Sequence, residues 1–318
     1  METRSTGAPH ISVITPLFNC LGHTKAMLAS LQAAMPPGVS HEIILIDDGS
    51  TDGTREWIAT LGDPVRVVLN ERNLGFGAAT NRGAAIARGE VLALLNNDLV
   101  LRRGWLWPML EALQNLRGKA GLVGNIQLDA ATGEVDHCGI AINLKGKPEH
   151  DRSRPGRLSA LFHPVRRVAA VTGACVVVNA STWRRLGGFD EGYMNGCEDV
   201  DLCLRAHDVG LVNAVALRSR VLHHVSASPG RKLRDEENTR RLVIRWRRLL
   251  AFLGSRDWTW DHFGRLVHDP RDFPDPLEAW KMALYIARVT ILPPRTALEG
   301  MNRAIDGELA RWQVMFSH

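Results

Sequence analysis

Short apolar runs alternate with amphipathic stretches along the first half of the chain. The apolar runs are continuous, as expected for parallel strands covered on both faces, and they predict strands over residues 11–15, 43–46, 65–69, 90–95 and 120–124. The stretches between them predict helices over residues 23–33, 57–61, 75–87 and 105–116. Repeated strand–helix units with short connections predict an α/β fold, a doubly wound, mostly parallel sheet flanked by helices.

The last third of the chain has longer helical patterns and many arginines. Six apolar residues recur there at helical spacing, namely Leu242, Val243, Trp246, Leu249, Leu250 and Leu253. Two further helices are predicted over residues 277–291 and 296–316. We therefore predict a sheet domain over residues 1–226 and a helical, basic C-terminal extension over residues 227–318. The apolar stripe fits a helix in a membrane interface or a helix packed onto the sheet domain.

Composition narrows the expected location of the protein. The 318 residues are 45% hydrophobic, enough for a full core, yet no run of about 18 apolar residues predicts a transmembrane helix. The first ten residues, METRSTGAPH, lack the apolar stretch of a signal peptide. The five cysteines show no CxxC spacing, which predicts reduced thiols rather than a disulfide framework or a zinc site. A cytoplasmic location follows.

Positive charge is concentrated in two stretches. Residues 218–248 contain ten arginines and lysines against three acids, and a second basic stretch covers residues 145–167. Such surfaces suit anionic partners, which include phosphates, acidic lipids and nucleic acid. A charged face in contact with water alone explains any single arginine equally well.

Polar residues follow two of the predicted strands. Asp47 and Asp48 come directly after the strand over residues 43–46, and the triplet Asn96-Asn97-Asp98 follows the strand over residues 90–95. Open α/β sheets bind ligands at the carboxyl ends of their strands. The two aspartates suit a base or a ribose, and the triplet suits Mg²⁺ or Mn²⁺. Helix capping and a simple turn are the structural alternatives.

A third acidic pair, Glu198-Asp199, precedes a segment with helical spacing. The dipole of that helix would keep Asp199 ionised near its N-terminus, where it could act as a general base, although helix capping explains the pair as well.

The first strand is followed by PLFN, at residues 16–19, where a dinucleotide-binding fold would need GxGxxG. A dehydrogenase is therefore excluded.

Six segments in this order closely resemble family 2 glycosyltransferases: SVITPLFN, EIILIDDGSTDGT, NERNLGFGAATNRG, GEVLALLNND, VTGACVVVNASTWRRLGGFDE and GCEDVDLCLR. The chain is most similar to the branch with bacterial rhamnosyltransferases and other enzymes of cell-envelope polysaccharide biosynthesis. The resemblance covers residues 11–224 and implies a GT-A fold, a nucleotide-sugar donor and a divalent cation, Mn²⁺ or Mg²⁺.

The resemblance also implies roles for single residues. Asp199 takes the position of the catalytic base, beside Glu198. Asp98 is the metal-binding carboxylate, completed by His223 or His224, with His223 favoured by its spacing. The donor-binding positions are Pro16, Asn19, Asp47, Asp48, Asn73, Asn97 and Gly173. The triplet lacks the first acid of the family's metal-binding motif.

These features together predict a hexosyltransferase-type enzyme that acts with inversion on a hydroxyl of a glycan or lipid-linked acceptor. A homodimer and peripheral contact with the inner face of the plasma membrane are further expectations, and nucleic acid is not an expected partner. Two alternatives stay open. A metal-dependent nucleotidyltransferase acting on sugar phosphates would need a Gly-rich basic loop where PLFN stands. A non-catalytic nucleotide-sugar-binding protein would not need the intact Glu198-Asp199 pair.

Overall fold

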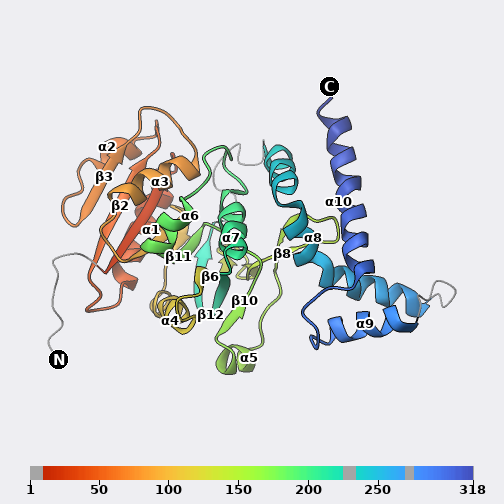
Figure 1. The fold of residues 1–318 in the computed structure, drawn as a ribbon. Helices are drawn as coiled ribbons and strands as arrows, with labels where there is room; N and C mark the ends of the chain where they lie inside the picture. Colours follow the sequence, from red (N-terminus) through yellow and green to blue (C-terminus); the bar gives the residue numbers. More distant parts are fainter. Residues whose placement is uncertain (1–9, 225–233, 269–275, 318) are drawn as a thin grey trace. The chain divides into compact units, whose positions relative to one another are not determined.

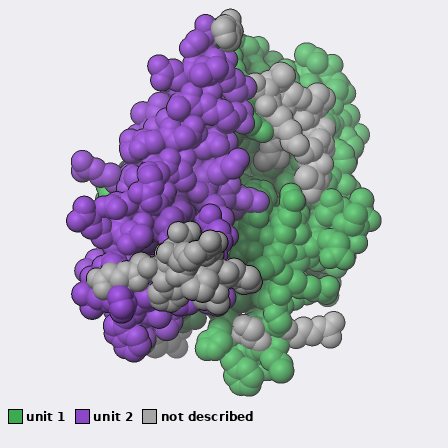
Figure 2. Space-filling view, turned by 90° about the vertical axis from the view of Figure 1, so that its right-hand side faces the viewer, with its two compact units in different colours: residues 1–140, 150–235 green, residues 141–149, 236–318 purple. Residues whose placement is uncertain are grey.

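The computed structural model describes residues 10–224, 234–268 and 276–317. The chain forms two compact units, which Figure 2 colours separately. Unit 1 comprises Met1–Ile140 and His150–Asp235, and unit 2 comprises Ala141–Glu149 and Glu236–His318. The predicted domain boundary after residue 226 lies outside the described residues, so that division stays a prediction.

Unit 1 is built on one large, mostly parallel sheet (Figure 1). Its main strands, in spatial order, are β10 (Val165–Arg167), β12 (Val212–His223), β6 (Ala120–Asp129), β11 (Cys175–Asn179), β4 (Val91–Leu95), β1 (Ile11–Leu17), β2 (His41–Asp47) and β3 (Val65–Leu69). Strand β11 runs antiparallel between β4 and β6, and β10 is antiparallel to β12. Two short strands extend the sheet: β5 (Leu99–Val100) on β12, and β7 (Val135–His137) on β6. The predicted fold class is confirmed.

Helices cover this sheet because its central strands are apolar on both faces. The helices of unit 1 are α1 (Leu21–Ala34), α2 (Thr54–Ile58), α3 (Phe76–Ile86), α4 (Trp107–Asn115), α5 (Arg157–Phe162), α6 (Ala180–Leu186) and α7 (Glu198–Asp208). Every residue of β1 and β4 is buried. Met27 and Leu31 of α1 and Met109 of α4 belong to the same core cluster as Val13 and Ala93. This burial fixes the strand ends that form the site.

In its described residues, unit 2 has three helices and a small hairpin. The helices are α8 (Asp235–His268), which is kinked at Trp246, α9 (Pro276–Ile286) and α10 (Arg295–Met315). Strands β8 (Ile140–Ile142) and β9 (Pro148–His150) form the hairpin that joins the units along the chain. Lys147 of the hairpin lies 2.8 Å from Glu308 of α10.

The apolar stripe of α8 is buried in part. Leu242, Val243 and Leu250 are fully buried, so they are not available to a membrane. Trp246, Leu249 and Leu253 of the same stripe are half-buried, and the choice between a membrane interface and packing onto the sheet domain stays open. Among the described residues, no helix combines the length and the apolar character needed to cross a bilayer.

Candidate active site

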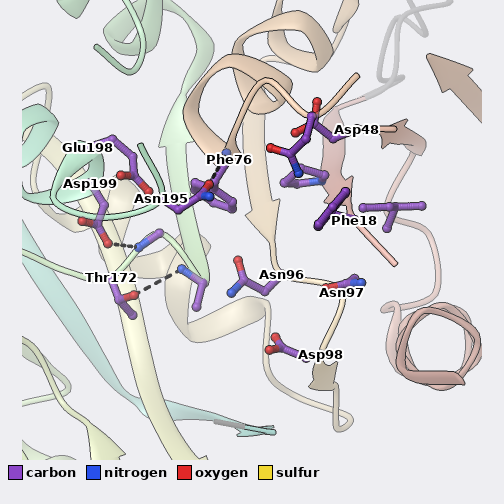
Figure 3. A pocket seen from close by; sticks show the side chains of 15 residues that line it. Phe18, Asp48, Phe76, Asn96, Asn97, Asp98, Thr172, Asn195, Glu198 and Asp199 are labelled. Carbon is purple, nitrogen blue, oxygen red and sulfur yellow. Dashed lines mark hydrogen bonds between the residues drawn. The ribbon is translucent and has the colours of Figure 1, made fainter. Parts of the chain in front are cut away.

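A pocket of about 170 Å³ lies at the carboxyl ends of β1, β2 and β4, where the sequence predicted a ligand site (Figure 3). Its lining contains eight of the predicted residues: Pro16, Asp48, Asn73, Asn97, Asp98, Gly173, Glu198 and Asp199. The other four, Asn19, Asp47, His223 and His224, lie outside the lining. Figure 3 shows Glu198 and Asp199 on one side of the pocket and Asp48 on the other.

The two aspartates after β2 are both held by the protein itself. Asp47 accepts hydrogen bonds from Nε of Arg55 at 2.7 Å and from the backbone N–H of Ser50 at 3.2 Å. Asp48 accepts from Nδ2 of Asn70 at 2.7 Å, and from two backbone N–H groups of a neighbouring loop. Asp47 therefore stabilises the turn after β2, and only Asp48 faces the pocket.

Asp48 fixes the loop that leads into α3. The backbone N–H groups of Leu74 and Gly75 donate to its carboxylate at 3.0 and 2.9 Å. At the end of this loop, the N–H of Phe76 donates to Oδ1 of Asn195 at 2.9 Å, which ties the loop to the segment before α7. Asn73, Phe76 and Asn195 all line the pocket. Asp48 thus shapes one wall of the site.

Asn19 organises the neighbouring turn rather than the pocket. Its Oδ1 accepts from the N–H of Thr51 at 2.8 Å, and its carbonyl oxygen accepts from Nδ2 of Asn97 at 3.3 Å. Asn97 also donates to Oγ1 of Thr24 at 3.0 Å. The turns after β1, β2 and β4 are therefore linked by side-chain amides.

Asp98 and His223 form an unusual buried pair at the end of β4 and β12. Oδ1 of Asp98 lies 3.2 Å from Nε2 of His223, and both side chains are almost fully buried. The two atoms are close together, but the geometry does not make a hydrogen bond between them. Neither atom has another hydrogen-bond partner in the described part of the chain. A carboxylate oxygen and an imidazole nitrogen without hydrogen-bond partners suit a shared divalent cation.

The two histidines at the end of β12, His223 and His224, differ in their surroundings. The backbone N–H of His224 donates to the carbonyl oxygen of Asp98 at 3.0 Å, while its ring packs against His23, with centroids 4.6 Å apart. His223 therefore is the one whose ring nitrogen faces the carboxylate. No cluster of three or more His, Cys, Asp or Glu side chains that could hold a metal occurs among the described residues. Further ligands would come from water or from the diphosphate of a donor.

Asp199 lies in the first turn of α7, on the wall opposite Asp48. Its Oδ2 accepts from the N–H of Gly173 at 2.7 Å, and its Oδ1 accepts from the N–H of Val200 at 2.8 Å. A Cβ on Gly173 would lie 3.1 Å from the ring of Phe76, so glycine allows this close approach. Glu198 is more buried, and its Oε2 accepts from the N–H of Gly196 at 2.6 Å. Of the pair, Asp199 is the more accessible carboxylate.

His137 supports the backbone that contacts Asp199, a role that its isolated place in the sequence gave no reason to predict. Its Nε2 accepts from the N–H of Thr172 at 3.4 Å and from the N–H of Gly139 at 3.2 Å. Burial, with smaller contributions from nearby cationic groups, lowers the pKa of His137 well below its ordinary value. The neutral ring therefore keeps its acceptor nitrogen at neutral pH.

Cys20 is a nucleophilic side chain near the site. Burial, followed by the charges of Asp52 and Asp98, raises the pKa of its thiol. A protonated thiol is a poor nucleophile, so Cys20 does not suit covalent catalysis. The five cysteines are all free thiols.

Several known proteins are similar to this chain. The model of the family described as "Glycosyl transferase family 2" matches residues 12–180. The chain is 31% identical to the O-antigen biosynthesis protein RfbC of Myxococcus xanthus, over 70% of this chain and 18% of that protein. It is 29% identical to an N-acetylglucosaminyl-diphospho-decaprenol L-rhamnosyltransferase of Mycobacterium tuberculosis, over 66% of this chain and 74% of that enzyme.

A solved structure shares the fold. The structure of GalNAc-T7 with UDP, GalNAc and Mn²⁺ superposes with a TM-score of 0.61 at 18% identity, over 77% of this chain and 49% of that one. The chain spans less than a third of the first curated relatives that it matches. Since the family model covers more than half of the chain, the chain belongs to glycosyl transferase family 2.

Proposed function

We propose that unit 1 transfers a sugar from a nucleotide-sugar donor to an acceptor hydroxyl, with inversion at the anomeric carbon. The observation that supports this most is the composition of one pocket. Asp199 and Asp98 both line this pocket. The N–H of Gly173 donates to Asp199. An oxygen of Asp98 that makes no hydrogen bond among the described residues lies 3.2 Å from His223. A base and a cation site at one cavity are what single displacement requires.

Asp199 is proposed as the general base. It would remove the proton from the acceptor hydroxyl while that oxygen attacks the anomeric carbon, and the bond to the nucleoside diphosphate breaks on the opposite face. The backbone N–H groups of Gly173 and Val200 hold its carboxylate in place at the wall of the pocket. Glu198, whose Oε2 is bound to the N–H of Gly196, would shape the turn before α7.

Asp98 and His223 are proposed to hold Mn²⁺ or Mg²⁺. The fit rests on these two buried atoms, which lie 3.2 Å apart and make no hydrogen bond among the described residues. The cation supplies Lewis-acid stabilisation of the departing diphosphate when it is bound. Pro16, Asn73 and Asn97 line the same pocket and would contact the donor, while Asn19 and Asp47 would act through the turns that they stabilise.

The acceptor is proposed to be a glycan or a lipid-linked glycan. This follows the names of the two relatives above, which concern O-antigen biosynthesis and a decaprenol-linked sugar. A cytoplasmic enzyme in peripheral contact with the inner face of the plasma membrane would meet such an acceptor. A homodimer stays part of the proposal, and nucleic acid is not proposed as a partner.

A donor panel tests the proposal. UDP-, GDP- and dTDP-sugars are compared by thermal shift with and without Mn²⁺, since a ligand of the folded state raises the melting temperature. We expect one base class to stabilise the protein, and to do so more strongly with Mn²⁺. Stabilisation by nucleoside triphosphates alone would instead indicate the nucleotidyltransferase alternative, which no observed contact favours.

A further inference from the structure

Helix α5 of unit 1 presents an apolar face to water. Leu158, Leu161 and Phe162 have exposed fractions of 72%, 58% and 72%. Their spacing, i, i+3 and i+4, places them on one side of the helix. Ala160, between them in sequence, is 7% exposed and faces inward. The large apolar side chains of this helix therefore point outward.

Arginines flank this helix in the sequence. Residues 152–167 contain five arginines and no acid. Arg152, Arg154 and Arg167 are exposed, and Arg152 also pairs with Asp136 at 3.4 Å. Arg166 turns inward and pairs with Asp151 at 3.0 Å. We call Leu158, Leu161 and Phe162, together with the three exposed arginines, the α5 patch. The patch combines apolar area with positive charge.

The helix is fastened to the sheet of its own unit. Arg218 of β12 donates to the carbonyl oxygens of Ala160 and Leu161, at 3.4 and 3.0 Å. A guanidinium at the last carbonyls of a helix satisfies acceptors that have no partner within the helix. Figure 1 shows α5 next to β10 and β12, at the margin of the sheet. This anchoring holds the apolar face outward.

We propose that the α5 patch docks unit 1 on an anionic phospholipid bilayer. Three apolar side chains would enter the interface, and the arginines would lie at the level of the lipid phosphates. Charge complementarity favours this occupant over a second copy of the chain. A two-fold contact would bring the same arginines of both copies together, and like charges oppose such a contact. Vesicle binding needs no donor or acceptor, so this proposal stands or falls separately from the proposed reaction.

Co-sedimentation of the full chain with vesicles tests the proposal. We compare vesicles of zwitterionic phospholipid with vesicles that also contain anionic phospholipid, at low and at high salt. The wild type should bind the anionic vesicles, and less so at high salt. Leu158→Ser combined with Phe162→Ser should lower the bound fraction about tenfold at both salt concentrations, because apolar burial is lost. Arg154→Glu combined with Arg167→Glu should lower binding to anionic vesicles only.

Matched controls come from the same unit. Trp107→Ser removes an apolar side chain of 49% exposure from α4, and Arg103→Glu reverses an exposed charge; neither should change vesicle binding. The proposal is overturned if the wild type stays in the supernatant, or if both pairs of substitutions bind like the wild type. It is also overturned if Leu158→Ser with Phe162→Ser only converts a dimer to a monomer in sedimentation velocity. If the variant with Leu158→Ser and Phe162→Ser does not fold, the variant with Arg154→Glu and Arg167→Glu tests the proposal.

Discussion

Two buried carboxylates at the same sheet edge, Asp48 after β2 and Asp98 after β4, have opposite surroundings. Both are nearly excluded from water, with exposed fractions of 3% and 5%. Asp48 is bound by Asn70, Leu74 and Gly75. Asp98 keeps one oxygen without a hydrogen-bond partner within the described residues, close to an equally unpartnered nitrogen of His223.

The difference separates a structural role from a ligand-binding role. A buried carboxylate with its hydrogen bonds made stabilises the loop that it binds. A buried polar atom without a partner costs stability, so its presence needs another explanation, such as a bound cation. Sequence position alone gave both residues a ligand-binding role. From their hydrogen bonds we propose that Asp98 binds a cation, whereas Asp48 chiefly holds the loop that lines the donor pocket.

Asp199 gives the largest expected effect, because its carboxylate is both held by the backbone and accessible from the pocket. Asp199→Asn should lower kcat by about 10²–10⁴-fold, since the base is lost, while the donor still binds. Steady-state kinetics at saturating acceptor and donor titration measure the two effects. Asp208→Asn, at the exposed end of α7, is the control. Normal turnover of Asp199→Asn would transfer the base role to Glu198.

Asp98 and His223 should show the next largest effect. Asp98→Asn or His223→Gln should raise the Mn²⁺ concentration for half-maximal activity by roughly 10–100-fold, because each removes one of two protein ligands. The matched control is His224→Gln, because the ring of His224 packs against His23. This substitution should change the Mn²⁺ concentration for half-maximal activity little. Full activity of the wild type in EDTA, or a larger effect at His224, contradicts the assignment.

Substitution of Asp48 should lower the stability of the fold, whereas substitution of Asp98 should raise the metal requirement. Asp48→Asn removes the charge that accepts from the backbone of Leu74 and Gly75, and should lower the free energy of unfolding by roughly 1–3 kcal/mol. Asp98→Asn should leave that free energy unchanged or raise it. Urea unfolding of both variants checks the pair. Equal destabilisation by the two substitutions would remove the distinction between the carboxylates.

The smallest expected effect is a pH dependence at His137. Its folded-state pKa is lowered by burial, so protons bind the unfolded state more readily. The stability should therefore be full above about pH 6.5, the unfolded value, and should fall below it by at most about 1.4 kcal/mol per pH unit. His137→Gln should flatten this slope in urea unfolding between pH 7 and 5. An unchanged slope would mean that the loss arises at other groups.

The sequence predicted the parallel half of the sheet well. Continuous apolar runs mark strands buried on both faces, so β3 was placed at its observed bounds and β1, β2 and β4 nearly so. The antiparallel strand β11 was missed, because its short run, Cys175–Asn179, lies between two motifs without a βα repeat of its own. The short strands β5 and β7 have too few residues to show a period.

Only the site residues that belong to recognisable sequence motifs could be predicted. Two strand ends and the start of α7 bring Asp48, Asp98 and Asp199 to one pocket, as expected from the resemblance. Phe76 and Asn195 were not expected there, since a bond between residues 119 positions apart leaves no local pattern. Nor could sequence show that Asp47 is paired with Arg55, because this depends on the fold of the turn after β2.

The most direct test of the central claim is the product released from a nucleotide sugar. Wild type and Asp199→Asn are incubated with the stabilising donor, Mn²⁺ and an acceptor, and the nucleotide product is identified by chromatography. The account predicts acceptor-dependent release of nucleoside diphosphate by the wild type and about 10²–10⁴-fold slower release by the variant. Equal release by both proteins, or pyrophosphate formed from a nucleoside triphosphate and a sugar phosphate, would contradict it.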